Sequence, residues 1–176
     1  WDALGRLAAG DAPETQAPAL SVLGKIADAT SDPQRWASLE GPLDSALGDP
    51  DEGVRRAAAE ALGRGGGGWA MALLRRALAD EAWTVRAQAL RSLTGGDDPE
   101  ARELLTAALG DPFASVRAAA ADGLGEPGSS AEALIRALDD PAPAVRAAAA
   151  AALGRLGDPK ALGALEALRT DDEVRV

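Results

Sequence analysis

The sequence contains no cysteine, no histidine and no tyrosine, and only five of its 176 residues are aromatic. Without thiols or imidazoles these residues cannot build a structural zinc site, a disulfide, a thiolate nucleophile or a Ser–His–Asp triad. Base stacking needs aromatic side chains, so their scarcity also counts against a nucleic-acid groove. The composition predicts a protein that is not an enzyme and holds no metal, cofactor or small-molecule substrate.

Positive charge is scarce as well. The 18 basic residues face 28 acidic ones, which gives a net charge of −10 and argues against nucleic acid or an anionic membrane as partner. No apolar run approaches the ~20 residues that span a bilayer, and no signal peptide is visible. We therefore expect a cytoplasmic protein. The excess of arginine over lysine, with abundant alanine and glycine, indicates a bacterial source.

What the sequence does have is an internal repeat, marked by the dipeptide Val-Arg. It recurs at intervals of 31, 31, 29 and 29 residues, at Val54, Val85, Val116, Val145 and Val174. A leucine lies eight residues after each of the first four valines, at Leu62, Leu93, Leu124 and Leu153. Another lies seven residues before, at Leu47, Leu78, Leu109 and Leu138. A fixed period of this length is the signature of a repeat architecture.

Each copy is expected to form two helices. Val54, Ala58 and Leu62 follow the spacing of one apolar helix stripe, and Gly63 marks its end. The predicted helices cover about 33–47, 51–63, 68–79, 82–93, 99–110, 113–124, 129–139, 142–155 and 159–169. Two such helices bury too little apolar surface to stand alone, so the pairs must stack. The sequence predicts an all-α, right-handed α-solenoid of stacked antiparallel helix pairs, with at least ten helices.

The copies predict a single solenoid over 1–176, with units at about 1–31, 32–66, 67–96, 97–127, 128–157 and 158–176. The first unit is a degenerate copy: when Leu23-Gly24 is placed in register with Leu153-Gly154, Thr15-Gln16 takes the place of Val-Arg. The chain begins with Trp1 instead of Met, and both ends cut through the pattern. We therefore expect a fragment of a longer protein.

The pattern resembles the short HEAT-like repeat first named from phycobilin lyases. Residues 134–159 carry its clearest copy, with Leu134, Asp140-Pro141, Val145-Arg146 and Leu153-Gly154. The resemblance covers nearly the whole chain and implies the solenoid fold. It is poorly specific for function, because similar repeats serve as scaffolds, adaptors, lyase subunits and appended enzyme domains.

One aspartate and one arginine recur in every complete copy. The aspartate ends the first helix, and the arginine lies in the first turn of the second, so the arginine can reach the aspartate of its own or of the neighbouring copy. Similar families use these positions as a ladder that links the layers. The predicted structural ladder consists of Asp49, Arg55, Asp80, Arg86, Asp111, Arg117, Asp140 and Arg146.

Two other patterns suggest chemistry but have structural explanations. Gly63-x-Gly65-x-x-Gly68 matches a dinucleotide-binding fingerprint, but it follows a predicted helix where the motif needs a strand, so a loose connection is favoured. Acidic clusters occur at 97–98, 139–140 and 171–173. Each falls at a helix end or in a turn, where carboxylates cap helices, and none has the spacing of a calcium loop.

The candidate binding surface comes from helical geometry. If the second helices line the concave side, the positions two, three and six residues after each Val are exposed, and many of them are alanine. The long polar side chains at these positions are Arg56, Glu60, Gln88, Arg91 and Asp122. Trp83 and Phe113 fall in turns, where they either form an exposed edge or are buried between layers, and burial is favoured.

These observations favour a non-catalytic scaffold that binds another protein or a peptide along the concave face. The alternative is a HEAT-like subunit or an appended regulatory domain of a larger enzyme, similar to the bilin lyases. The small number of aromatic residues counts against a site that binds a bilin. A base-excision enzyme built on such repeats would need a basic groove, which the net charge of −10 opposes.

Overall fold

The computed structural model describes residues 12–30, 36–63, 68–93, 98–126 and 131–157, together with residues 8, 10, 129 and 159. Within these ranges the regular elements are all α-helices, and no strand occurs. The chain divides into two compact units, Trp1–Ser92 and Leu93–Val176. The all-α repeat fold predicted from the sequence is confirmed. The stacking of all copies in one continuous array stays a prediction.

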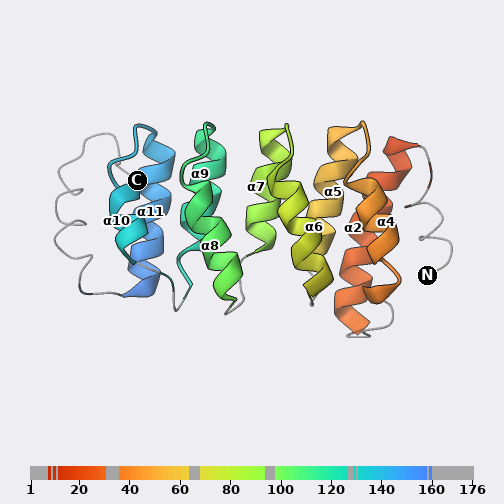
Figure 1. Ribbon diagram of the computed structural model, residues 1–176, viewed down its shortest axis with the longest axis horizontal. Coiled ribbons are helices and arrows are strands. Elements are labelled where there is room, and N and C mark those ends of the chain that lie inside the picture. The colour runs from red at the N-terminus through yellow and green to blue at the C-terminus, as the bar shows by residue number, and fades with distance from the viewer. Residues whose placement is uncertain are drawn as a thin grey trace. The chain divides into compact units, whose positions relative to one another are not determined.

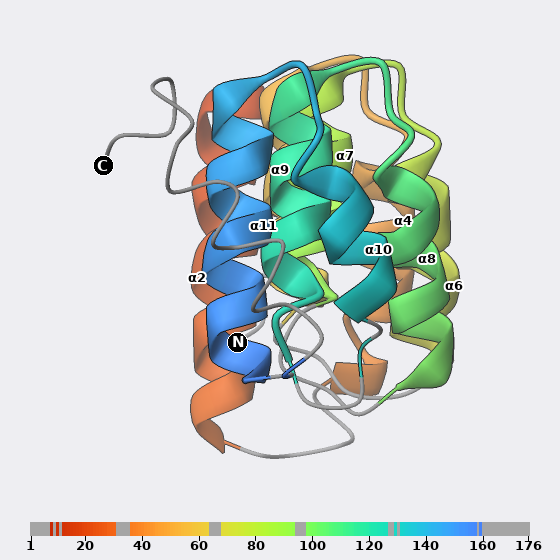
Figure 2. The same ribbon diagram turned by 90° about the vertical axis from the view of Figure 1, so that its left-hand side faces the viewer.

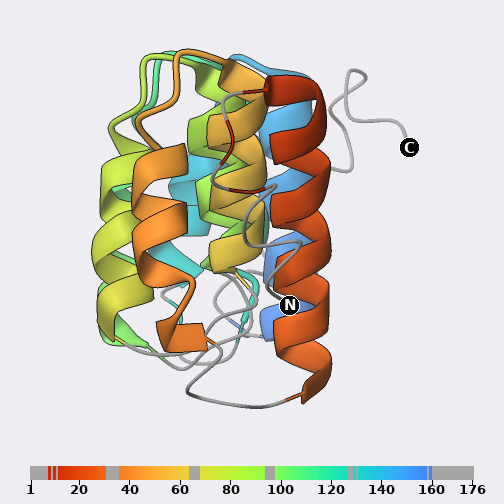
Figure 3. The same ribbon diagram turned by 90° about the vertical axis from the view of Figure 1, so that its right-hand side faces the viewer.

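The described residues of the first unit form two helix pairs and one further long helix. The pairs are α4 (Glu40–Ala46) with α5 (Glu52–Leu62), and α6 (Gly68–Leu78) with α7 (Trp83–Ser92). The further helix, α2 (Pro13–Thr30), is the second helix of the degenerate first copy. Helix α5 packs between α2 and α7 in one layer, and α4 contacts α6 in the other (Figures 1 and 3).

The second unit repeats this arrangement with two pairs. These are α8 (Pro99–Ala108) with α9 (Ala114–Gly123), and α10 (Ala131–Ala137) with α11 (Pro143–Leu156). The second helices, α9 and α11, pack side by side, and each contacts the first helix of its own pair (Figure 2). The predicted helix at 159–169 lies outside the described residues.

Local sequence signals explain where these helices begin and end. The Asp51 carboxylate accepts a hydrogen bond from the Val54 N–H (3.1 Å) and caps α5, and Gly157 ends α11 in the left-handed region with φ 62°. The helix expected over 33–47 is interrupted: residues 36–37 are helical, a turn follows at 38–39, and α4 begins at Glu40, while residues 33–35 lie outside the described residues. This start places Pro42 in the first turn, where the missing N–H of proline leaves no helix hydrogen bond unmade.

The core consists of the repeated valines and leucines. The four valines of the Val-Arg dipeptides that the structure describes are at most 1% exposed, and the leucines eight residues later are at most 6% exposed. Small residues bring the second helices close together. A Cβ at Gly24 would lie 3.1 Å from the Ala61 Cα, so glycine lets the α2 backbone approach α5. Stability must therefore come from many small interfaces between neighbouring helices.

Successive copies of the first unit are joined by a buried ion pair. Arg55, in the first turn of α5, donates from Nε to Asp80 Oδ2 (2.7 Å) and from Nη2 to Asp80 Oδ1 (3.1 Å). Its Nη1 donates to the carbonyls of Asp49 (2.9 Å) and Pro50 (3.1 Å) in its own copy. One guanidinium thus holds its own turn by backbone oxygens and the next copy by a carboxylate. We call this arrangement a rung.

The second unit contains the same rung. Arg117 donates from Nε to Asp140 Oδ2 (2.7 Å) and from Nη2 to Asp140 Oδ1 (2.8 Å), and its Nη1 donates to the carbonyl of Asp111 (2.9 Å). Each Asp side chain also accepts the N–H two residues further on, at 2.8 Å. The pairs are Asp49 with Asp51, Asp80 with Ala82, Asp111 with Phe113, and Asp140 with Ala142.

The other two ladder arginines, Arg86 and Arg146, form the hydrogen bonds to backbone carbonyls of their own copy that are also part of a rung. Arg86 Nη1 donates to the carbonyl of Asp80 (2.8 Å), and Arg146 Nη1 donates to the carbonyl of Asp140 (3.0 Å). In the degenerate first copy, Gln16 occupies the arginine position. It is 5% exposed, and its Oε1 accepts no hydrogen bond from the residues that the structure describes.

The rungs set the protonation of the two aspartates that receive them. Burial alone would raise the pKa of Asp80, but the hydrogen bonds from Arg55 and the Ala82 N–H and the nearby positive charges outweigh it, so this pKa lies below its usual value. For Asp140 the hydrogen bond from Arg117 is the largest cause, and it lowers the pKa against the opposing effect of burial. Both carboxylates therefore remain ionised at neutral pH.

The first prediction concerns stability at neutral pH. Arg55→Gln leaves the largely buried Asp80 carboxylate without its guanidinium, which should lower the free energy of unfolding by about 1–3 kcal/mol. The matched control is Arg56→Gln, because Arg56 is the next residue and its side chain is exposed. Urea unfolding of both variants measures the difference. Equal midpoints for Arg55→Gln and Arg56→Gln would contradict a stabilising rung.

The second prediction concerns pH. An unfolded aspartate titrates near pH 3.9, and the folded pKa of Asp80 lies lower. The stability from this rung is therefore complete above about pH 5 and is lost as the pH falls through the folded pKa. We expect the stability difference between the wild type and Arg55→Gln to shrink as the pH falls below about 4. A difference that stays constant from pH 7 to pH 2 would show that ionisation of Asp80 plays no part.

Candidate functional site

Four of the five predicted contact residues lie on neighbouring helices of the first unit. Arg56 and Glu60 are on α5, and Gln88 and Arg91 are on α7, which packs directly against α5. The two arginines are exposed, and the other two side chains are partly exposed. Packing of the second helices thus brings these four residues onto one face. We call them the α5–α7 face.

The fifth predicted contact residue, Asp122, belongs to the second unit. It lies on α9, where Arg155 of α11 donates from Nη2 to its carboxylate and to its backbone carbonyl, both at 2.7 Å. Asp122 thus links two second helices. The sequence analysis did not identify Arg155 as the partner of Asp122. Its position on the second helix of the following copy, ten residues after Val145, could have indicated this contact.

The alanines between these polar residues do not form the open surface that the sequence suggested. Ala57, Ala87 and Ala119 are 7%, 1% and 9% exposed. The expectation of exposed small residues was therefore wrong at these three positions. The reason is that the second helices pack side by side, so part of what was taken as the outer face lies in the seam between helices.

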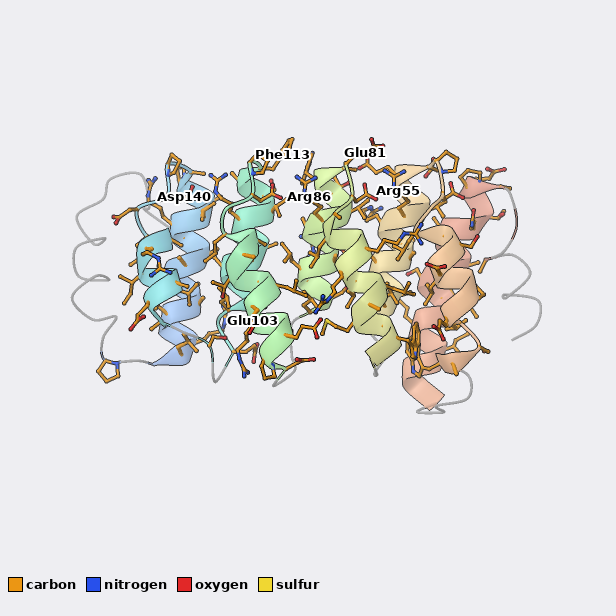
Figure 4. The ribbon with its side chains drawn as sticks, in the orientation of Figure 1. Arg55, Glu81, Arg86, Glu103, Phe113 and Asp140 are labelled. Atoms are coloured by element: carbon orange, nitrogen blue, oxygen red, sulfur yellow. The ribbon has the colours of Figure 1, made fainter. Side chains whose placement is uncertain are left out.

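The two turn aromatics are exposed, so the favoured expectation of burial was wrong. Trp83 is 40% exposed and Phe113 is 46% exposed. Trp83 begins α7 and Phe113 caps α9, and residues at the first turn of a helix project from its end instead of its packed side. Figure 4 shows Phe113 at the tip of the turn that leads into α9. Trp36, by contrast, is only 8% exposed and packs in the core.

The remaining sequence patterns lie only partly within the described residues. Residues 64–67 of the glycine-rich segment, Asp97 and the acidic cluster at 171–173 lie outside the described residues. Asp98 caps α8 by accepting the Glu100 N–H (2.9 Å). In the part of the chain that the structure describes, no three acidic side chains come together as metal ligands, and no helix is long and apolar enough to cross a membrane.

A cavity in the second unit was not predicted. It has a volume of about 330 Å³ and lies between the first helices of the two pairs. The lining residues are Thr106, Leu109, Gly110, Ala133, Arg136, Ala137, Asp139 and Asp140. Leu109 and Asp140 are repeat positions from the sequence analysis, but their spacing along the chain does not show that a cavity forms between the first helices.

Comparison with solved structures shows the same fold in other repeat proteins. The structure is similar to YibA of Escherichia coli, with 22% identity, a TM-score of 0.68 and coverage of 98% of this chain and 63% of that one. It is also similar to a designed armadillo repeat protein in complex with the peptide (KR)4, with 19% identity, a TM-score of 0.59 and coverage of 97% and 92%. At such identities the likeness shows the fold alone.

A third similar structure is that of human deoxyhypusine hydroxylase in complex with glycerol, with 24% identity, a TM-score of 0.50 and coverage of 96% of this chain and 67% of that one. No curated protein matches the sequence.

The sequence pattern of HEAT repeats matches residues 2–94, 70–133 and 101–176, and together these matches cover almost the entire chain. The chain therefore belongs to the HEAT repeat family.

Proposed function

We propose that the chain is a cytoplasmic, non-catalytic scaffold that binds another protein or a peptide along the face of its second helices. The observation that carries the proposal is the α5–α7 face, where Arg56 and Arg91 stand exposed on two helices packed against each other. The buried arginine next to them, Arg55, is engaged in a rung. The rung is thus formed by Arg55, while the side chain of Arg56 beside it is exposed.

The charges of the α5–α7 face suit recognition of a partner by ion pairs. Arg91 donates to Gln88 Oε1 within its own helix, from Nη2 at 3.2 Å and from Nε at 3.4 Å, and Glu60 provides a charge of the opposite sign on α5. Charges at the rim of an interface mainly set the rate of encounter and the choice of partner. A mixed face of this kind favours a partner segment that itself carries both signs.

The comparisons support a binding role without identifying the partner. The similar designed armadillo repeat protein is in complex with the peptide (KR)4, which supports a role of such a fold in holding a peptide. The likeness to deoxyhypusine hydroxylase supports a second candidate, a repeat domain of a larger enzyme. At 24% identity that likeness carries the fold alone, so the scaffold is the stronger proposal.

The third prediction tests this face with peptides selected from a random library on the whole chain. Arg56→Glu combined with Arg91→Glu should lower the affinity for the selected peptides by about tenfold or more. Each charge reversal replaces an attraction to the peptide by a repulsion. The melting temperature should stay at the wild-type value, since both side chains are exposed. Fluorescence anisotropy measures the affinities.

The matched control is Arg75→Glu combined with Arg102→Glu, which makes the same change in net charge on the first helices α6 and α8. It should leave the affinity of the selected peptides unchanged. If both double variants bind as the wild type does, while Trp83→Ala or Phe113→Ala abolishes binding, the contact surface is the turn edge and the proposal is wrong.

A further inference from the structure

The two units differ in how their first helices meet. In the first unit, Arg76 on α6 donates from Nη1 to the carboxylate of Asp44 on α4 (2.6 Å) and to the backbone carbonyl of the same residue (3.0 Å). Arg76 lies nine residues before the Val of its copy, and Asp44 lies ten residues before the Val of the preceding copy. This ion pair bridges two neighbouring first helices.

The second unit keeps the arginine and lacks the acid. Counting back from the Val in the same way places Arg136 where Arg76 lies and Thr106 where Asp44 lies. The Thr106 hydroxyl donates to the Arg102 carbonyl (2.8 Å) within its own helix. The Arg136 side chain is exposed, and its guanidinium forms no hydrogen bond or ion pair with the residues of this unit that the structure describes.

The 330 Å³ cavity lies at this place, and both Thr106 and Arg136 line it. Its apolar lining comes from Leu109, Ala133 and Ala137. Of the two carboxylates in the lining, Asp140 is already held by Arg117 in the rung. Arg136 is therefore the one cation of the lining residues, and it stands beside apolar surface that a side chain of a partner can cover.

We infer that this cavity binds an acidic side chain of a partner protein, whose carboxylate takes the place at Arg136 that Asp44 takes at Arg76. The inference goes beyond the proposed function, because it concerns the first helices of the second unit and not the α5–α7 face. Exposed Asp139 at the rim repels further negative charge. The preferred ligand is thus a single Glu or Asp followed by neutral or basic residues, and not a run of acids.

The experiment uses the whole chain and two short peptides. The probe is acetyl-Ala-Glu-Leu-Lys-amide, and its neutral control is acetyl-Ala-Gln-Leu-Lys-amide. The side-chain Nε–H resonance of Arg136 in an NMR titration reports the contact directly. We expect a saturable shift with the glutamate peptide and binding at least about fivefold weaker with the glutamine peptide.

Two substitutions at exposed positions complete the test. Thr106→Asp supplies the missing acid inside the protein, so it should remove the peptide response of Arg136. Asp44→Thr removes the acid from the first unit, so it should give Arg76 a response to the glutamate peptide that the wild type lacks. The inference is overturned if the Arg136 resonance does not move in the wild type, or if it moves equally in the Thr106→Asp variant.

Discussion

The structure of each unit depends on one bidentate contact, between a guanidinium in the first turn of a second helix and the carboxylate that ends the first helix of the next copy. Alanine-rich layers bury little apolar surface per residue, so each interface between copies is weak by itself. The Arg55–Asp80 and Arg117–Asp140 pairs add a directional link at these interfaces, with N–O distances of 2.7 Å. Backbone carbonyls accept hydrogen bonds from each arginine and a backbone N–H donates to each aspartate, which makes the burial of these charges tolerable.

This constraint also determines which side chains remain for binding. The ladder arginine and the alanines between the second helices are used in packing. The copies therefore differ mainly in the residues at the neighbouring positions. Arg56 follows Arg55 directly and yet is exposed, whereas Ala87 follows Arg86 and is buried. The first helices vary in the same way, since an internal ion pair closes one junction and a cavity opens at the corresponding one.

The sequence predicted the helix pairs well because valine, leucine and capping residues recur in register, and most observed ends lie within about two residues of the expected ones. It did not predict the direction of the rung, because spacing alone does not tell the carboxylate of the same copy from that of the next. Burial of Trp83 and Phe113 was wrongly favoured, since hydrophobicity says nothing about a side chain that projects from a helix end. The sequence did not predict the Arg136 cavity. The Arg76–Asp44 contact that corresponds to its position is recognised only in the folded structure.

Successive copies are joined by a direct energetic coupling between the arginine and the aspartate of a rung. A double-mutant cycle on Arg117 and Asp140 measures this coupling. Arg117→Gln, Asp140→Asn and the double variant are unfolded in urea at neutral pH, and the sum of the single losses is compared with the loss in the double variant. We predict a favourable coupling of about 1–3 kcal/mol, because each single change leaves the other partner partly buried and unpaired. A coupling of zero, with strictly additive losses, would contradict the claim that this contact joins one copy to the next.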